Sequence, residues 1–190
     1  MQIQKSALFL DRDGVINVNH GYVFKKENFS WIDGIFDLVK QANKANMLVF
    51  VVTNQSGIGR GYYSETEFTL LNTWMVSEFK RSGGHIDKVY WCPHHPEHAV
   101  GDYRKVCECR KPKTGMIEQA LNEFAINLSS SVMVGDKASD MYTAINAELG
   151  RAYWLGAHES DMHELADQEH QKTIIQPIQA LSNIRLSTVR

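Results

Sequence analysis

The sequence lacks the features that mark several large classes of protein. It contains no apolar run near the roughly 18 residues that a membrane-spanning helix needs. Its formal net charge is only −2, so its overall charge favours neither nucleic acid nor an anionic membrane as a partner. No small-residue cleavage site follows the apolar patch in residues 1–10, which indicates a first strand rather than a signal peptide. We therefore expect a cytoplasmic monomer whose partners are neither nucleic acid nor membrane.

Cysteine is scarce, with three residues that all fall between positions 92 and 109. An odd number in a reducing compartment argues against a disulfide framework and favours metal binding. Three thiolates and one imidazole form a common tetrahedral zinc set, and four protein ligands indicate a structural rather than a catalytic ion. The predicted zinc ligands are Cys92, His94, Cys107 and Cys109. His95 and His98 are rival ligands ranked below His94, and the alternative is a solvated loop with three reduced cysteines.

The order of apolar segments predicts the fold class. Short apolar runs alternate with longer amphipathic segments, which indicates an α/β protein with a mainly parallel sheet and right-handed crossovers. Strands are expected over residues 7–10, 47–52, 89–91, 132–134 and 152–155, and helices over residues 35–45, 64–81, 116–124 and 139–149. The segment from His158 onward carries no clear pattern. The 190 residues are expected to form one domain, residues 1–190, with a zinc loop at residues 92–109.

Polar or metal-binding residues follow four of the predicted strands. They are Asp11-Arg12-Asp13, Thr53-Asn54, Cys92 and Gly135-Asp136-Lys137. The packing of a core does not explain such residues at four strand ends. Because ligands of open parallel sheets bind beyond the carboxyl ends of the strands, the sequence predicts a functional site at this edge.

Asp11 and Asp13 lie two residues apart, just past the first predicted strand. Alternate residues of an extended segment face the same way, so both carboxylates can converge on one site. Two close carboxylates repel each other unless a proton or a cation separates them, and a hard cation such as Mg²⁺ prefers oxygen ligands. Asp136 can supply a further oxygen. The alternative, that the Asp13-Gly14 pair only forms a turn or a helix cap, leaves the polar residues at the other strand ends unexplained.

Four motifs resemble those of the haloacid dehalogenase-like phosphatases in their order and approximate spacing. They are Asp11-Arg12-Asp13-Gly14, Thr53-Asn54, Lys111 and Gly135-Asp136. The resemblance covers most of the chain and implies a Rossmann-like sheet flanked by helices. It also implies that Asp11 is the nucleophile and Asp13 the general acid and base. Mg²⁺ would lie between the Asp11 carboxylate, the Asp13 backbone carbonyl and Asp136.

The chemistry of these residues agrees with the implied roles. A carboxylate nucleophile splits the hydrolysis of a phosphate ester into two easier transfers. The Thr53 hydroxyl, nearby backbone N–H groups and the Lys111 ammonium can hold the phosphoryl oxygens while charge redistributes. Asn54 beside Thr53, and Lys137 beside Asp136, are further candidates for the same site.

Two branches of this family carry a zinc loop of this kind. One comprises the D,D-heptose 1,7-bisphosphate phosphatases of nucleotide-activated heptose and lipopolysaccharide core precursor synthesis, and the other the histidinol-phosphate phosphatases. The chain resembles the heptose branch more closely, over residues 9–23, 53–61, 92–95 and 107–112. Arg60 offers a fork for the second anionic group, which a bisphosphate has and histidinol phosphate lacks. The resemblance implies hydrolysis of the 7-phosphate of D-glycero-D-manno-heptose 1,7-bisphosphate through an aspartyl phosphate, with histidinol-phosphate phosphatase as the alternative.

The spacing of the motifs leaves no room for a large cap domain. About forty residues separate Asp13 from Thr53, and they already include a helix and a strand. An open site should recognise its substrate through loops. The candidate substrate contacts are Asn17, His20, Arg60, Lys105 and Arg110. For His20 and Lys105, ordinary surface polarity is the alternative.

Two other classes of function fit the sequence less well. A zinc-stabilised binding module without catalysis would lack at least one of the charged motif residues, and none is missing. A nucleic-acid 3′-phosphatase would carry a basic groove, whereas the net charge is −2 and no basic run is present. We therefore predict a phosphatase of a small sugar bisphosphate with Mg²⁺ and Zn²⁺ as its cofactors.

Overall fold

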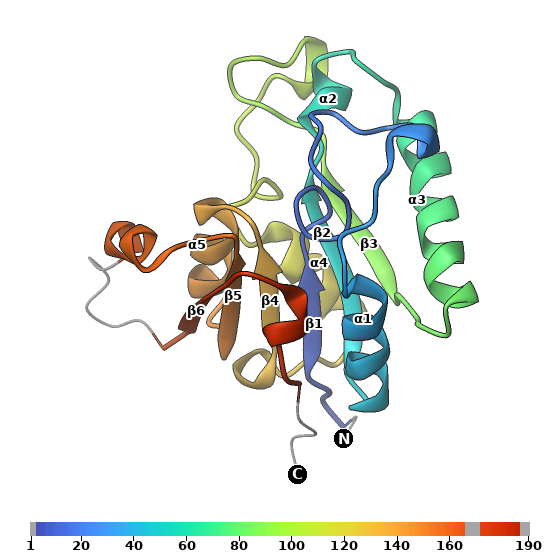
Figure 1. Ribbon diagram of the computed structural model, residues 1–190. Coiled ribbons are helices and arrows are strands. Elements are labelled where there is room, and N and C mark those ends of the chain that lie inside the picture. The colour runs from blue at the N-terminus through green and yellow to red at the C-terminus, as the bar shows by residue number, and fades with distance from the viewer. Residues whose placement is uncertain (1–2, 166–171, 187–190) are drawn as a thin grey trace.

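The chain forms a six-stranded parallel sheet with helices on both faces (Figure 1). The computed structural model describes residues 3–165 and 172–186. Along the sheet the strands follow the order β3-β2-β1-β4-β5-β6, and every neighbouring pair is parallel. The strands are β1 (Ala7–Leu10), β2 (Leu48–Asn54), β3 (Lys88–Cys92), β4 (Val132–Gly135), β5 (Arg151–Leu155) and β6 (Ile174–Ile178). The expected fold class is confirmed.

Two apolar clusters hold the helices against the sheet. On one face, Leu8 and Leu10 pack with buried residues of α1 (Ile35–Lys44) and α3 (Glu65–Arg81). On the other, Ala7 and Phe9 pack with buried residues of α4 (Gly115–Glu123) and α5 (Ala138–Asn146). Because alternate side chains of one strand enter both clusters, the central strands are apolar throughout. Each fully buried large side chain stabilises this arrangement by about 1.5–3 kcal/mol.

The start of α3 shows how a local signal sets an element boundary. The Ser64 side chain accepts a hydrogen bond from the Glu67 backbone N–H at 3.1 Å, and Glu67 Oε2 accepts one from Ser64 N–H at 2.8 Å. This reciprocal capping box satisfies two N–H groups that the first turn leaves unpaired. The helix predicted to open at Ser64 and run to about Arg81 is confirmed.

The last strand is the main element for which the sequence carried no signal. β6 pairs with β5 at the edge of the sheet, after a 3₁₀ segment over Glu159–Leu165. Its first four residues alternate between exposed and partly buried, Ile178 is buried, and Gln176 and Pro177 interrupt the apolar pattern. Proline is tolerated in a strand at an edge, where its missing N–H leaves no partner unpaired. Edge position therefore explains why this strand lacks the apolar run of the central ones.

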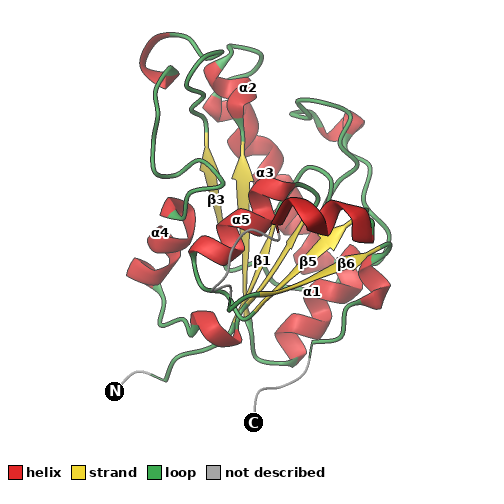
Figure 2. Cartoon of the chain, turned by 90° about the vertical axis from the view of Figure 1, so that its left-hand side faces the viewer, coloured by secondary structure: helices red, strands yellow, loops and turns green. Residues whose placement is uncertain are grey.

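The segments between the motifs form loops rather than a further domain. Between β1 and β2 the chain forms a 3₁₀ turn (Lys26–Asn28) and α1, and between β3 and α4 it forms a loop with one 3₁₀ turn (Gly101–Tyr103). Figure 2 shows the short α2 (Ser56–Gly59) and the neighbouring loops above the tip of β3. No large cap covers this end in the described residues, as expected. Among these residues, no helix has the length and apolar character needed to cross a membrane.

Candidate active site

A cavity of about 440 Å³ opens at the carboxyl ends of the central strands. The strand order reverses direction between β1 and β4, and ligands of open α/β sheets bind at such a switch point. The walls of the cavity combine residues from the ends of β1 and β2 with residues from α2, α5 and the loop before α4. Among them are Asp11, Asp13, Tyr22, Thr53, Asn54, Gln55, Tyr63, Arg110, Lys111, Lys137 and Asp140. Residues of three sequence motifs, and residues directly after the fourth, thus meet in one cavity.

Asp11 is the first residue after β1 and is only 5% exposed. Its Oδ1 accepts a hydrogen bond from the Arg12 backbone N–H at 2.7 Å and lies 2.9 Å from Lys111 Nζ. Burial raises the pKa of Asp11 to about 7; the Lys111 ammonium opposes this rise, and three neighbouring carboxylates add to it. A carboxylate in such a place needs further positive charge to stay ionised.

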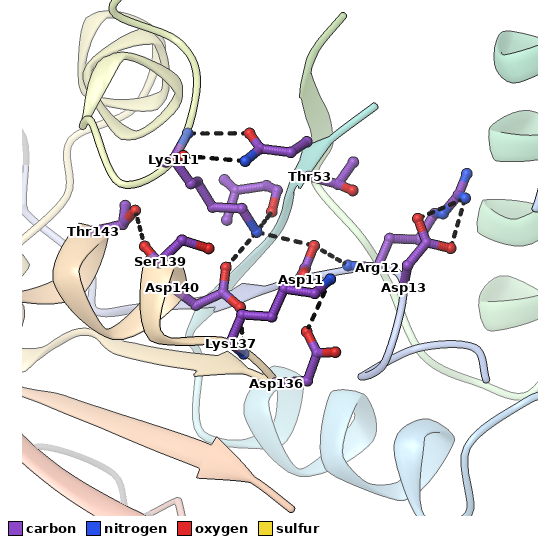
Figure 3. Close-up of polar contacts among 12 residues, drawn as sticks. Asp11, Arg12, Asp13, Thr53, Lys111, Asp136, Lys137, Ser139, Asp140 and Thr143 are labelled. Carbon is purple, nitrogen blue, oxygen red and sulfur yellow. Dashed lines mark hydrogen bonds and ion pairs between the residues drawn. The ribbon is translucent and has the colours of Figure 1, made fainter. Parts of the chain in front are cut away.

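Lys111 lies at the centre of the charged groups and is 3% exposed. Figure 3 shows its side chain reaching toward Asp11 and Asp140, with Nζ 2.9 Å from Asp11 Oδ1 and 2.6 Å from Asp140 Oδ1. Nζ also donates to the Val52 carbonyl at 2.9 Å, so three acceptors meet the three hydrogens of the ammonium. Burial lowers the pKa of Lys111, but the two carboxylates outweigh it and raise the pKa above its usual value. Lys111 is therefore a fixed positive charge beside Asp11.

Asp136 completes an acidic group that suits a hard cation. Oxygens of Asp11, Asp136 and Asp140 lie within 4.8 Å of one another. Asp136 Oδ1 is buried without a hydrogen-bond partner, and Lys137 Nζ lies 3.7 Å from it. A Cβ on Gly14 would lie 2.1 Å from Asp136 Oδ2, so only glycine lets this carboxylate approach the loop after β1. Three carboxylates beside one buried ammonium leave an excess of negative charge, and this oxygen donor set fits Mg²⁺.

The Asp13 carboxylate points away from Lys111. Figure 3 shows it beside Arg12, on the other side of Asp11 from Lys111 and Asp140. It accepts hydrogen bonds from Arg12 Nη2 at 2.7 and 2.8 Å, from Asn17 Nδ2 at 3.0 Å and from Gln55 Nε2 at 2.9 Å. Burial raises the pKa of Asp13, but the Arg12 guanidinium and these hydrogen bonds outweigh it and hold the pKa below its usual value. Asn17, predicted as a substrate contact, is fully buried here as a partner of Asp13.

Thr53 and Asn54 end β2 and have different partners. The Thr53 hydroxyl accepts a hydrogen bond from Gln55 Nε2 at 2.8 Å and lines the cavity. The Asn54 amide pairs with the backbone of Lys111: Oδ1 accepts from its N–H at 3.0 Å, and Nδ2 donates to its carbonyl at 3.2 Å. Asn54, predicted to bind phosphate, thus holds the Lys111 backbone against β2.

Of the predicted loop contacts, Arg110 lines the cavity, and its Nη1 donates to the His94 carbonyl at 3.1 Å. Lys137, predicted as a further residue of the site beside Asp136, lines the cavity as well. Arg60 lies outside the lining, with its guanidinium 5.8 Å from the centre of the Tyr22 ring. His20 and Lys105, both among the described residues, are exposed and are not part of the cavity lining.

The three cysteines and one histidine of the predicted zinc loop come together. The loop brings Cys92, at the end of β3, beside His94, Cys107 and Cys109, with all four donor atoms within 4.8 Å. Contacts of 3.0–3.5 Å join the three sulfurs, and His94 Nδ1 lies 3.3 Å from Cys109 Sγ. A tetrahedral zinc with bonds of about 2.3 Å to sulfur places its sulfur ligands about 3.8 Å apart, somewhat farther than these contacts. The type of the four donors and their gathering at one point fit zinc.

The rival histidines lie outside this group. His95 Nδ1 accepts hydrogen bonds from the backbone N–H groups of Glu97 and His98, at 3.2 and 3.1 Å. The ring of His98 lies 4.7 Å from that of His95, centre to centre. The geometry favours His94 over both.

Three residues of the site were not singled out from the sequence: Gln55, Tyr63 and Asp140. Asp140 follows Asp136 by four residues, and its Oδ2 accepts a hydrogen bond from the Lys137 backbone N–H at 3.1 Å. This position reads from sequence as an ordinary helix cap. Gln55 lies within the segment that resembles the heptose branch, and this resemblance could have marked it as a site residue. No sequence pattern around Tyr63 marks it as one.

Two curated relatives resemble the chain over most of its length. The D-glycero-beta-D-manno-heptose-1,7-bisphosphate 7-phosphatase of Vibrio cholerae is 49% identical over 146 residues, which cover 77% of this chain and 78% of the relative. The D-glycero-alpha-D-manno-heptose-1,7-bisphosphate 7-phosphatase of Burkholderia mallei is 50% identical over 148 residues, 78% of each. Residues 108–178 also match a family described as HAD-hydrolase-like.

Solved structures agree with this relationship. A HAD-like phosphatase from Mesorhizobium loti superposes with a TM-score of 0.83 at 32% identity, covering 94% of this chain and 82% of the other. The D,D-heptose 1,7-bisphosphate phosphatase of B. bronchiseptica, complexed with magnesium and phosphate, superposes with a TM-score of 0.73 at 24% identity, covering 93% and 94%. This second likeness concerns the fold alone. With two relatives near 50% identity over three quarters of its length, the chain belongs to the D-glycero-D-manno-heptose-1,7-bisphosphate 7-phosphatase family of HAD-like hydrolases.

Proposed function

We propose that the chain is a Mg²⁺-dependent phosphatase that releases the 7-phosphate of D-glycero-D-manno-heptose 1,7-bisphosphate. The observation that carries the proposal is the buried Asp11 carboxylate in contact with Lys111 at the floor of an open cavity. The names of the relatives near 50% identity support the substrate. The proposal includes action as a cytoplasmic monomer, in a single domain, on a small soluble molecule.

In the first step, an oxygen of the Asp11 carboxylate attacks the phosphorus atom. The bond from phosphorus to the sugar oxygen breaks, and Asp13, left protonated by the preceding turnover, gives this oxygen a proton. Although burial raises the pKa of Asp13, Arg12 and the neighbouring donors hold it low, which makes Asp13 a ready proton donor. The positive charge of Lys111 stabilises the negative charge that moves onto the phosphoryl oxygens, and the Thr53 hydroxyl donates to one of them. The product alcohol leaves, and the phosphoryl group remains on Asp11 as an acyl phosphate.

In the second step, Asp13 as a carboxylate takes a proton from water. The water oxygen attacks phosphorus, the bond from phosphorus to Asp11 breaks, and inorganic phosphate is released. Asp11 returns as a carboxylate and Asp13 as an acid, so one water is consumed in each turnover. Asp140 contacts Lys111 rather than the reacting atoms and holds its ammonium in place.

The ligands of the magnesium ion in this proposal are the Asp11 and Asp136 carboxylates and the Asp13 backbone carbonyl. The bound ion supplies positive charge that offsets the repulsion between the Asp11 carboxylate and the phosphate anion. Asp136 Oδ1 supports this assignment, because it is buried without a hydrogen bond and its ion pair with Lys137 is long, at 3.7 Å.

The second phosphate of the substrate would meet Arg110 and Arg60. Burial, and then the positive charges of Arg110 and Arg60, lower the pKa of His95, so both guanidinium groups act on this one side chain. Arg110 lines the cavity directly, and Arg60 lies over Tyr22, whose ring is part of the same wall. A guanidinium fork binds a phosphate with two parallel hydrogen bonds.

A substrate panel tests the proposed function. With Mg²⁺, we expect kcat/KM for the heptose 1,7-bisphosphate to exceed that for histidinol phosphate by about tenfold or more, because only the bisphosphate gains contacts with the arginines. Both anomers belong in the panel, since the relatives are named for different ones. Phosphate release is measured for each substrate.

The Arg60→Ala variant serves as the internal control of this panel. It should weaken turnover of the bisphosphate more than turnover of a simple monophosphate, and equal losses would remove Arg60 from the second-phosphate site. A wild-type preference for histidinol phosphate would keep the mechanism and overturn the substrate.

The zinc assignment is tested separately with Cys107→Ser. Losing one of four ligands should lower the zinc content, measured by elemental analysis, to less than half of that in the wild type. Because structural zinc binding contributes folding energy, we expect Tm to fall by about 5 °C or more. His95→Ala is the matched control and should retain the zinc. Unchanged zinc in Cys107→Ser would exclude Cys107 from the ligand set.

A further inference from the structure

We propose that Gln55 is a positioning residue that aims two groups of the reaction, the Asp13 carboxylate and the Thr53 hydroxyl, and that Tyr63 fixes the orientation of its amide. The inference rests on the proposed function and concerns residues to which no role has been given above. Its basis is a buried hydrogen-bond network that joins residues from three loops at the edge of the cavity.

The Gln55 amide bridges the two groups with one nitrogen. Its side chain is 2% exposed, and its backbone N–H donates to the Cys92 carbonyl at 2.7 Å, which anchors the residue to the end of β3. Nε2 donates to Asp13 Oδ2 at 2.9 Å and to Thr53 Oγ1 at 2.8 Å. An amide nitrogen carries two hydrogens, so both are used. The acceptor atoms of the acid–base residue and of the phosphate-binding residue are thereby held at a set separation.

This bridge also sets whether the Thr53 hydroxyl donates or accepts a hydrogen bond on the side of the cavity. A hydroxyl has one hydrogen to donate and lone pairs to accept with. Because Thr53 Oγ1 already accepts from Gln55, its own hydrogen is directed elsewhere, and the side chain lines the cavity. Gln55 thus leaves the Thr53 hydroxyl free to donate its hydrogen to a phosphoryl oxygen. Such donated hydrogen bonds stabilise the negative charge of the transition state.

Gln55 is one of three donors to Asp13, and it differs from the other two. Arg12 and Asn17 also hold the carboxylate, but neither contacts Thr53. A neutral amide weakens the proton affinity of Asp13 less than a guanidinium does. Removing Gln55 would leave Asp13 held by Arg12, which also donates to Oδ2 at 2.8 Å, and by Asn17, but would remove the bridge from Asp13 to Thr53.

Tyr63 sets which end of the Gln55 amide faces the site. Its hydroxyl donates to Gln55 Oε1 at 2.6 Å, and burial raises its pKa to about 12, so the hydroxyl keeps the hydrogen that it donates. A flipped amide would turn Oε1 toward the Asp13 carboxylate, where two acceptors repel each other. Tyr63 opposes this flip because only the observed orientation gives its hydroxyl hydrogen an acceptor in Gln55.

Tyr63 is itself held firmly in place. Its ring stacks on Phe24, with centres 5.0 Å apart and planes inclined by 11°. A Cβ on Gly57 would lie 2.3 Å from Tyr63 Cε1, so the glycine leaves space that the tyrosine ring fills. A rigid second layer of this kind is what keeps reacting groups within the narrow tolerance that catalysis requires.

The test compares an alkyl with an aryl substrate. Gln55→Met keeps the length of the side chain and removes its hydrogen bonds, and Tyr63→Phe removes only the hydroxyl. Substrates are heptose 1,7-bisphosphate, whose sugar oxygen needs a proton to leave, and p-nitrophenyl phosphate, whose phenolate does not. The measured quantity is kcat/KM, which reports the steps up to departure of the leaving group.

For Gln55→Met we expect kcat/KM on the bisphosphate to fall about 10- to 100-fold, and on the aryl phosphate by a clearly smaller factor. The reason is that the aryl substrate loses only the contribution of Thr53. Gln55→Glu should lose at least as much on both substrates, because a carboxylate would accept the Thr53 hydrogen and repel Asp13. Tyr63→Phe should lose about 3- to 10-fold on the bisphosphate.

Tyr90→Phe is the matched control for Tyr63→Phe. Tyr90 is equally buried, on β3, and its hydroxyl contacts Glu123 instead of the site. It should keep wild-type kcat/KM, while both variants keep a similar Tm. If Gln55→Met does not fold, the comparison of Tyr63→Phe with Tyr90→Phe decides the proposal alone.

Two results would overturn the positioning role: wild-type kcat/KM in Tyr63→Phe and Gln55→Met, or equal losses on the alkyl and aryl substrates. A wild-type protein inactive on the bisphosphate would instead contradict the proposed function. In that case the same comparison is made with the alkyl phosphate that the wild type hydrolyses, and its outcome still decides the role of Gln55.

Discussion

Replacing Asp11 with asparagine should abolish phosphate release, with kcat reduced by at least about 10⁴-fold. An amide oxygen is too weak a nucleophile to form the acyl phosphate, so the first step has no substitute pathway. The fold should survive, because Lys111 keeps its contact of 2.6 Å with Asp140 and the repulsion among the buried carboxylates is reduced. The measurement is phosphate release with Mg²⁺, together with Tm.

The matched control for this change is Asp37→Asn. Asp37 is an exposed residue of α1 that pairs with Lys40, so the same change of charge occurs far from the cavity. Its kcat should equal that of the wild type. Activity within tenfold of the wild type in Asp11→Asn would contradict the covalent mechanism, whatever the substrate.

Lys111→Met should damage both stability and activity. It removes the ammonium that lies 2.9 Å from Asp11 and 2.6 Å from Asp140 and leaves two buried carboxylates without their partner. Breaking a buried ion pair on one side costs about 3–5 kcal/mol, so we expect the free energy of unfolding without Mg²⁺ to fall by that amount. Activity should fall at least about 10³-fold, because the charge that faces the phosphoryl oxygens is gone. Urea unfolding and phosphate release measure the two effects.

Two further variants separate these effects. Lys113→Met changes a partly exposed lysine two residues away, paired with Glu108 at 2.7 Å, and should change the free energy of unfolding by less than about 1 kcal/mol. The double variant Lys111→Met/Asp140→Asn removes one of the stranded carboxylates, so it should regain part of the stability but none of the activity. A Lys111→Met protein as stable and as active as the Lys113→Met protein would rule out the central position given to Lys111.

Much of the fold could be predicted because its signals are local. The run Ala7–Leu10 was predicted as a strand with the bounds it has, and the capping box at Ser64 marked the start of α3. By contrast, β6 is an edge strand with Gln176 and Pro177, and only its pairing with β5 makes it a strand. A central strand has to be apolar on both faces, whereas an edge strand is defined by its neighbour.

For the site, motif spacing predicted which charged residues meet. Asp11 and Asp136 were expected at one place, because parallel strands bring their carboxyl ends to the same edge of a sheet. Lys111 follows no strand and was assigned to the site by the resemblance to the haloacid dehalogenase-like phosphatases. The clustering of all three cysteines in one loop likewise pointed to a metal group.

The sequence by itself thus determined the α/β fold class, the charged motifs and the four candidate zinc ligands. Only the tertiary structure decided which partner each polar side chain has. Asn54 pairs with the backbone of Lys111, 57 positions away, and Gln55 with Asp13, 42 positions away. It also made Asp140 a partner of Lys111. The physical reason is that a hydrogen bond acts over about 3 Å, so its partner depends on which strand ends become neighbours, and no local pattern carries that information.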